Sequence, residues 1–156
     1  MMIMSIVKRL VLICLAVAVF VSCSGDDNMD SPSGRDALIV KLGNVVVYSD
    51  DEVEWRLEPN LATVTPPLYD LYMDGTRFVA LMPMLDMEVN GLENQHSQPD
   101  QHFLYQTTAI VPSIKGNPMP KYTLSNFRCE VTDWNLLKVW FSCKGYDVTY
   151  IKNLNN

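Results

Sequence analysis

The feature that most constrains the fold of this chain is an alternation of apolar and polar residues that recurs along most of its length. It is cleanest from Glu52 to Glu58, where Val53, Trp55 and Leu57 point to one face and charged residues point to the other. This two-residue period is typical of a half-buried antiparallel strand. No stretch of about ten residues has the 3.6-residue period of a helix. The sequence therefore predicts an all-β antiparallel barrel or sandwich of about seven to nine strands.

A hairpin is predicted across residues 68–82, because two strand-like runs flank Asp74 and Gly75. The pair Asp-Gly favours a type I′ turn, in which both central residues have a positive φ. Residues 84–89 would continue the second strand after Pro83, which lacks a hydrogen-bond donor and favours an edge or a bulge. A two-residue loop would place three pairs on one mostly apolar side: Tyr69 with Ala80, Leu71 with Phe78, and Met73 with Thr76.

Further strands are predicted over residues 37–48 and 103–111, and a last hairpin joins 122–132 to 137–141. Matching the apolar faces of this hairpin requires a loop with an odd number of residues. Up to Cys143 the apolar residues of this hairpin occupy odd-numbered positions, and from Tyr146 they occupy even-numbered ones. A bulge at Lys144–Gly145 would account for the change. Two segments are predicted to lack strands: a polar loop at 91–101, and the proline-rich residues 112–120.

The N-terminus carries the pattern of a targeting signal. Lys8 and Arg9 precede an apolar run over residues 10–21, which is shorter than the roughly 20 residues of a membrane-spanning helix. The run ends just before Cys23, an arrangement that resembles a bacterial lipoprotein signal, in which this cysteine is lipidated and becomes the N-terminus. The expected organisation is a lipoprotein signal peptide at 1–22, the lipidated Cys23 with a flexible acidic linker at 23–34, and a single β domain at 35–156.

The acidic stretch after Cys23, from Ser24 to Asp27 with Asp30, resembles the export signal that takes Bacteroidetes lipoproteins to the cell surface. The expected location is therefore the outer membrane, facing the cell surface, with the lipid anchor at Cys23 as the membrane contact. Removing residues 1–22 leaves 10 basic and 18 acidic residues, a net charge of −8. No block of basic residues exists, which disfavours nucleic acid as a partner.

Three stretches of the chain resemble the calycin-like, or lipocalin-like, lipoproteins of gut Bacteroidetes. The stretches are Tyr69–Gly75 running into Phe78, Met82–Met87, and Tyr122–Phe127. The resemblance implies a calycin-like β-barrel and a surface address. Members of this group mostly have no assigned activity. Calycins in general bind small apolar ligands, although a fold by itself does not determine a function.

His96, Asp100 and His102 are candidate ligands for Zn²⁺, because two imidazoles and a carboxylate lie in one polar loop. A loop whose ligands lack supporting hydrogen bonds is a poor metal site. A solvated loop is therefore favoured over a metal site, and no cofactor is expected.

Cys129 and Cys143 are a possible disulfide, since a protein outside the cytoplasm can form one. Only a five-residue loop at 134–138 would set the two cysteines directly opposite each other. A three-residue loop would place them near or beyond the ~7 Å Cα separation that a disulfide can bridge. The alternative is a pair of buried free thiols.

Aromatic and sulfur-containing side chains offer two further candidate sites. Trp134, in or beside a turn, is a possible platform for stacking against a sugar ring, whereas Trp55 and Trp140 are expected in the core. Three methionines could bind Cu(I) through their thioethers, but packing in the core is the favoured interpretation. These methionines are Met82, Met84 and Met87.

Catalysis finds little support in the sequence. Gly-x-Ser-x-Gly, Ser-x-x-Lys and His-Glu-x-x-His are all missing from the sequence. Asp70 and Asp86 could form the carboxylate pair of a glycosidase, but a chain with 18 acidic residues holds many such pairs. The expectation is a non-enzymatic binding or accessory module for a small apolar ligand or a glycan. The alternatives are a structural or protein-interaction component of the cell envelope and a small hydrolase.

Overall fold

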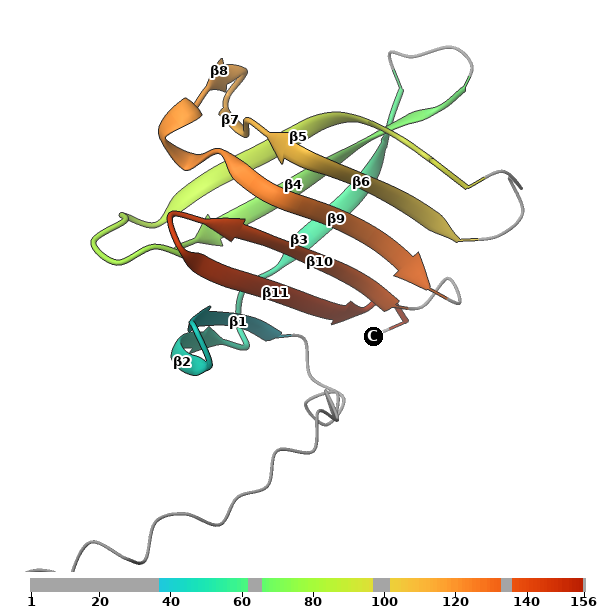
Figure 1. The fold of residues 1–156 in the computed structure, drawn as a ribbon. Helices are drawn as coiled ribbons and strands as arrows, with labels where there is room; N and C mark the ends of the chain where they lie inside the picture. Colours follow the sequence, from blue (N-terminus) through green and yellow to red (C-terminus); the bar gives the residue numbers. More distant parts are fainter. Residues whose placement is uncertain (1–36, 62–65, 97–101, 133–135, 156) are drawn as a thin grey trace, which may run out of the picture. The chain divides into compact units, whose positions relative to one another are not determined.

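The computed structural model describes residues 37–61, 66–96, 102–132 and 136–155, and within these ranges the predicted all-β antiparallel fold is confirmed (Figure 1). No helix in these ranges is long and apolar enough to span a membrane. The strands with six or more residues are β1 (Ala37–Leu42), β2 (Val45–Asp50), β3 (Trp55–Asn60), β4 (Leu68–Thr76), β5 (Leu85–Glu93), β6 (Phe103–Ile110), β9 (Leu124–Thr132), β10 (Leu136–Cys143) and β11 (Tyr146–Asn153). The proline-rich segment holds β7 (Ser113–Ile114), β8 (Asn117–Pro118) and the 3₁₀ helix η1 (Pro120–Tyr122).

The strands form two sheets, with the order β2-β1-β11-β10-β9-β6 in one and β3-β4-β5-β7-β8 in the other. In Figure 1 the orange and red strands β9, β10 and β11 lie across the green strands of the second sheet. No strand pair joins the two sheets within the described residues, so they do not close into a hydrogen-bonded barrel. The largest fully buried side chains come from both sheets and from the segment after β4: Trp55, Tyr150, Phe78, Phe127, Leu38, Leu71, Met73, Met87, Leu92, Leu124, Leu137 and Val40.

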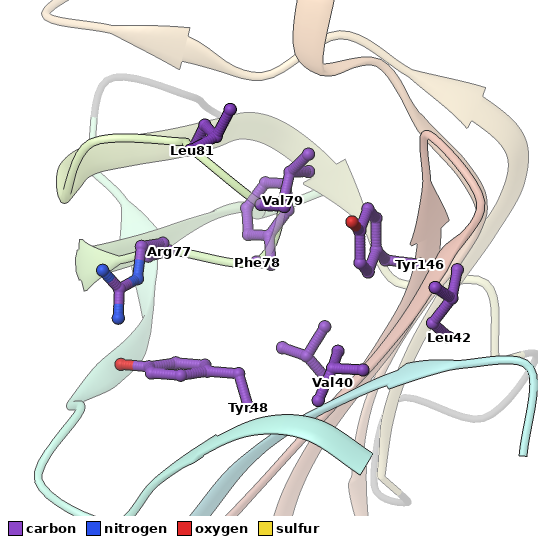
Figure 2. A pocket seen from close by; sticks show the side chains of 10 residues that line it. Val40, Leu42, Tyr48, Arg77, Phe78, Val79, Leu81 and Tyr146 are labelled. Atoms are coloured by element: carbon purple, nitrogen blue, oxygen red, sulfur yellow. The ribbon is translucent and has the colours of Figure 1, made fainter. Parts of the chain in front are cut away.

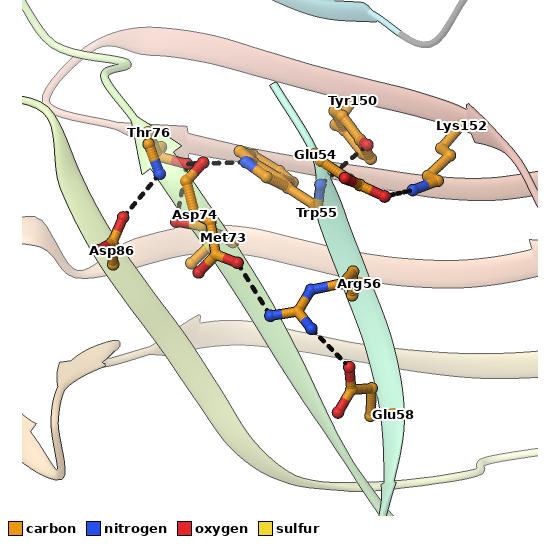
Figure 3. Close-up of polar contacts among 11 residues, drawn as sticks. Glu54, Trp55, Arg56, Glu58, Met73, Asp74, Thr76, Asp86, Tyr150 and Lys152 are labelled. Carbon is orange, nitrogen blue, oxygen red and sulfur yellow. Dashed lines mark hydrogen bonds and ion pairs between the residues drawn. The ribbon is translucent and has the colours of Figure 1, made fainter. Parts of the chain in front are cut away.

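Trp55 at the start of β3 and Tyr150 in β11 join the two sheets (Figure 3). Their rings stack with centroids 4.6 Å apart. The backbone N–H of Trp55 donates a hydrogen bond to Tyr150 Oη at 2.9 Å, and the Tyr150 hydroxyl donates to the Val53 carbonyl oxygen at 3.4 Å. Both rings are fully buried. One contact therefore removes apolar area from water and also satisfies a buried N–H group.

The indole of Trp55 extends this network within its own sheet. Its Nε1–H donates to Thr76 Oγ1 at 2.7 Å, and that hydroxyl donates to the Met73 carbonyl oxygen at 3.0 Å. The hydroxyl of Thr76 is thereby paired although the residue is fully buried, which avoids the cost of an unmet polar group. Beside this network, Lys152 Nζ on β11 forms an ion pair of 2.6 Å with Oε1 of Glu54, the residue just before β3.

The predicted hairpin at Asp74–Gly75 is wrong, because β4 continues through both residues and pairs with β5 instead. Asp74 and Gly75 together oppose the single residue Asp86, which makes a β-bulge. Gly75 has a φ of 61°, and its N–H donates to Asp86 Oδ1 at 2.8 Å. A glycine with positive φ suits a bulge as well as a turn, so the dipeptide alone cannot distinguish them. The observed pairs are Tyr69 with Leu92, Leu71 with Val89, and Met73 with Met87.

A second bulge of the same kind lies at the other end of this strand pair. Asn90 and Gly91 on β5 oppose Asp70 on β4. Gly91 has a φ of 74°, and its N–H donates to Asp70 Oδ1 at 2.8 Å. Asp70 Oδ2 accepts a further hydrogen bond from Asn60 Nδ2 at 3.0 Å. In both bulges an aspartate on the opposite strand therefore binds the N–H of the glycine.

The predicted odd-numbered loop of the last hairpin is confirmed, because Thr132 pairs with Leu136 across residues 133–135. The bulge expected at Lys144–Gly145 is instead a two-residue turn that joins β10 to β11. Lys144 and Gly145 have φ values of 52° and 84°, as a type I′ turn requires. A two-residue turn pairs each odd-numbered residue of β10 with an even-numbered residue of β11. The apolar residues therefore move from odd to even positions after the turn.

The remaining predictions have mixed outcomes. Residues 37–48 form strands as expected, but as a hairpin of β1 and β2 with Gly43 in its turn. The strand predicted at 103–111 is β6. The polar loop expected at 91–101 starts later, because β5 runs to Glu93. The signal peptide, Cys23 and the linker lie outside the described residues and stay predictions.

Replacing Tyr150 with Phe tests the contact between the sheets. The variant keeps the stacked ring but leaves the buried N–H of Trp55 without its acceptor, so we expect the free energy of unfolding to fall by about 2 kcal/mol. The measurement is urea denaturation followed by tryptophan fluorescence. Tyr105→Phe is the matched control, because its ring also packs on the core but its hydroxyl takes no part in this network. An equal loss in both variants would contradict the assigned role.

Candidate functional site

An apolar pocket of about 360 Å³ lies between the β1–β2 hairpin and the residues that follow β4 (Figure 2). Its volume falls in the range of roughly 300–1,000 Å³ that is typical of small-molecule sites. Two other hollows have more polar linings, one rich in Gln, Thr and Asn and the other in carboxylates. The apolar pocket is lined by Val40, Leu42, Val47, Tyr48, Arg77, Phe78, Val79, Ala80, Leu81 and Tyr146.

The inner end of the pocket is part of the hydrophobic core. Phe78 and Val40 are both 1% exposed. The ring of Phe78 meets those of Phe141 and Tyr122 edge-on, at centroid distances of 5.1 and 6.3 Å. Because well-packed core side chains have little freedom to move, this end of the pocket is preformed. An apolar group that entered here would extend the core.

A bulge in β2 shapes the opposite wall. Val40 pairs with Tyr48 and Lys41 pairs with Val46, so Val47 has no partner on β1. The extra residue breaks the two-residue period and leaves three successive valines, residues 45–47, exposed at the edge of the sheet. Val47 of this run lines the pocket.

Arg77 and Tyr48 form the polar end of the pocket (Figure 2). The guanidinium carbon of Arg77 lies 4.9 Å from the centre of the Tyr48 ring. The Tyr48 hydroxyl donates to Asp50 Oδ2 at 2.6 Å, and this hydrogen bond lowers the pKa of Asp50 and raises the pKa of Tyr48. The pocket thus offers an apolar body with one cationic donor at its end, which suits a ligand that has one acceptor group.

Three exposed apolar side chains, Leu42, Val47 and Leu81, line the pocket, and exposed Val45 and Val46 precede Val47 on β2. We call these five residues the apolar rim. Leu81 is completely exposed, and the others have exposed fractions between 48% and 64%. Apolar side chains that gather at one place on a surface are typical of a binding site.

The predicted metal ligands are not brought into a described site. His96 is exposed and His102 is partly buried, and they flank a segment containing Asp100, which lies outside the described residues. Within the described part of the chain, no group of three or more His, Cys, Asp or Glu residues could hold a metal ion.

The possible disulfide between Cys129 and Cys143 is not formed, and both residues are buried free thiols. Cys129 pairs with Val139, which precedes Cys143 by four residues on the same strand. Four residues of strand correspond to roughly 13 Å, too far for a disulfide. Burial raises the pKa of both thiols.

The tryptophans have different environments. Trp55 is in the core as expected, but the same expectation for Trp140 is wrong. Phe141 fills the core position on β10, so the strand alternation turns Trp140 to the outer face, where Arg128 lies over its ring at 5.3 Å. Trp134, the candidate for sugar stacking, lies outside the described residues. Of the three methionines, Met82 and Met87 are buried and Met84 is 60% exposed.

Asp70 and Asp86 do not form a carboxylate pair. Each lies at a different bulge of the β4–β5 pair, about five residues apart along β4, which corresponds to roughly 16 Å. A glycosidase needs its two carboxyl groups within about 5–9.5 Å of each other. Both carboxylates instead accept hydrogen bonds from glycine N–H groups.

The pocket could not be anticipated from the sequence pattern, because residues 77–82 resemble a strand that pairs with β4. The signal that was available is the run of three valines at 45–47 directly after Gly43–Asn44. A half-buried strand alternates, so a run of three apolar residues next to a turn indicates either a bulge or a binding surface.

Comparisons of the chain with protein-family models, with curated proteins and with solved structures found no match. The functional interpretation therefore depends on the geometry and chemistry of the pocket.

The hydrogen bond between Tyr48 and Asp50 predicts a pH-dependent contribution to stability. The pKa of Asp50 in the folded protein lies below its ordinary value of 3.8. The ionised carboxylate therefore stabilises the folded state above about pH 4, and this contribution is lost as the pH falls through the folded pKa. We expect wild type to be more stable than Asp50→Asn at pH 7, with the difference shrinking below pH 4 in urea titrations. Asp51→Asn is the control, since exposed Asp51 makes none of these hydrogen bonds.

Proposed function

We propose that this domain is a non-enzymatic binding module that holds a small apolar ligand in the pocket between β1–β2 and residues 77–81. The observation that supports the proposal most directly is a preformed apolar cavity of about 360 Å³ that opens from the core to the surface. Pockets of this size with few polar groups are the usual sites for small molecules. Burial of the ligand supplies affinity at about 25 cal/mol for each Å² of apolar surface removed from water.

Arg77 sets the polarity of the proposed ligand. It is the one cationic side chain among the residues that line this pocket. A guanidinium can donate two hydrogen bonds to a carboxylate, and such charge-assisted bonds are stronger than neutral ones. The proposed ligand therefore has an apolar body and a single anionic or acceptor group, as a medium-chain fatty acid has.

The address of the module is part of the same proposal. The lipoprotein signal at residues 1–22 and the acidic residues after Cys23 support a lipid anchor in the outer membrane with the domain at the cell surface. The resemblance to calycin-like lipoproteins supports ligand binding in a β domain. The proposed pocket lies beside an edge strand, however, and not in the mouth of a closed barrel.

Arg77→Met tests the ligand site with octanoate as the probe. The change keeps an apolar stem but removes the guanidinium, and a lost charge-assisted hydrogen bond of roughly 1.5–3 kcal/mol lowers affinity by about tenfold or more. Binding is measured by calorimetry with the chain from residue 24, which contains every residue of the core. Arg56→Met is the matched control, because Arg56 is exposed on β3 away from this pocket. Failure of wild type to bind octanoate or octanol would overturn the proposal.

Cys23→Ala tests the lipid anchor. Only the thiol at this position can accept the lipid under the proposed processing, so we expect the variant to incorporate no fatty acid. The measurement is metabolic labelling of cells with a radioactive fatty acid, followed by isolation of the protein. Ser22→Ala is a control that leaves the cysteine in place. Equal labelling of Cys23→Ala and wild type would contradict the anchor.

A further inference from the structure

We propose that the apolar rim docks on a lipid bilayer and that the pocket therefore opens toward the membrane. The inference rests on the proposed function, since it supplies the route by which an apolar ligand reaches the pocket. The rim residues are contributed by two separate parts of the chain, the β1–β2 hairpin and the turn after β4, and Leu42, Val47 and Leu81 from these two parts line one pocket. The partner is the bilayer surface itself, without a specific protein receptor.

The distribution of exposed apolar side chains supports this partner. The described residues expose nine large apolar side chains, and five of them belong to the rim. Hairpin tips and turns that carry exposed Leu and Val can place these side chains at the boundary between headgroups and acyl chains. In water these side chains leave exposed apolar surface gathered on one hairpin and one turn, which a docked bilayer would cover.

The backbone of Leu81 is a second, independent observation. Leu81 has a φ of 62°, in the left-handed region that disfavours residues with a Cβ atom, and its side chain is completely exposed. The turn around it closes with a hydrogen bond of 3.0 Å from Met82 N–H to the Val79 carbonyl oxygen. Glycine or asparagine would suit this position better. A leucine that is strained and also exposed is unfavourable in the isolated domain, and an apolar partner for its side chain would compensate.

The charges near the rim fit a bilayer with anionic lipids. Arg77 lines the pocket, and Lys144 lies in the turn before Tyr146, the partner of Leu42 on the neighbouring strand. Long basic side chains reach from an apolar interface to phosphate groups. Asp50 and Asp147 also lie nearby, where they accept hydrogen bonds from Tyr48 at 2.6 Å and from Ser142 at 2.7 Å, and their charges offset part of this attraction.

The edge strand favours a lipid surface over a second protein strand. β2 is an edge of its sheet, but the bulge at Val47 interrupts its ladder and twists the edge away from straight pairing. One edge strand of the other sheet, β3, is protected differently, by charged Arg56 and Glu58 and by Pro59. A second strand would have to pair residue by residue with β2. A fluid bilayer has no such requirement and can accept apolar side chains from both faces of β2.

The chain length to the proposed anchor allows both contacts at once. From Cys23 to Ala37, the first residue of β1, there are 14 residues, which can span at most roughly 50 Å. β1 then leads directly to Leu42 at the rim, over about 17 Å of strand. An anchor at Cys23 can therefore lie in the same bilayer that the rim contacts.

The test is flotation of the chain from residue 24, which cannot be acylated at Cys23, with vesicles of phosphatidylethanolamine and phosphatidylglycerol. We expect wild type to float with the vesicles and Leu81→Asp to bind about tenfold more weakly. Leu61→Asp is the matched control, because Leu61 is 93% exposed but follows β3 at the end of that sheet away from residues 77–84. Leu81→Gly separates folding from docking: it relieves the positive φ, so we expect an unchanged or higher melting temperature together with weaker vesicle binding.

Three results would overturn the inference. The first is wild type that stays unbound at all vesicle concentrations, and the second is equal weakening by Leu81→Asp and Leu61→Asp. The third is a dimer in light scattering that Leu81→Asp dissociates, which would assign the rim to a second copy of the chain. Ala80→Trp, which fills the pocket beside the rim, distinguishes this inference from the proposed function: octanoate binding in the absence of vesicles should fall while flotation persists.

Discussion

The contact between Trp55 and Tyr150 is the interaction on which the rest of the structure depends. Within the described residues no strand pair joins the two sheets, so side chains carry much of the contact between them; these rings stack at 4.6 Å while the Tyr150 hydroxyl accepts the buried N–H of Trp55 at 2.9 Å. The indole also binds Thr76, directly before the segment that forms one wall of the pocket. The packing between the sheets and the position of the candidate site are therefore coupled through a single residue. Because the interior is densely packed, a change at Trp55 would be transmitted to Phe78 and its neighbours.

Glycines with a positive φ explain why the sequence pattern located the irregular backbone positions but misassigned which of them are turns and which are bulges. Asp74–Gly75 and Lys144–Gly145 resemble each other as local signals, yet the first is a bulge and the second is a hairpin turn. Both need a positive φ, so local preference cannot separate them. The choice depends on which strand lies opposite, and β4 finds a longer apolar partner in β5 than residues 77–82 could provide. Aspartates that resembled a catalytic pair serve these bulges by binding glycine N–H groups.

The candidate site illustrates the same limit. Its residues come from β1, β2, the segment after β4, and the start of β11, and no two of these segments carry a motif. The alternation rule places Val40 and Tyr146 toward the interior, but it cannot show that a bulge at Val47 opens a cavity beside them. The exposure and the positive φ of Leu81 are likewise consequences of a turn that forms only when β4 is paired with β5. The proposed binding surface is thus a product of the strand order.

The sequence by itself determined the all-β class, the antiparallel pairing of the last strands and the faces that form the core, because the two-residue period and the parity of loops are local properties. The proposed cellular location likewise rests on a local pattern in the sequence, because targeting signals are linear. Only the tertiary structure decided which strands are neighbours, that Cys129 and Cys143 stay apart, and that Arg77, Tyr48 and Leu81 meet around one pocket. Those outcomes depend on contacts between residues far apart in the chain, and the energies of these contacts compete across the whole core. No short segment of the sequence encodes the result by itself.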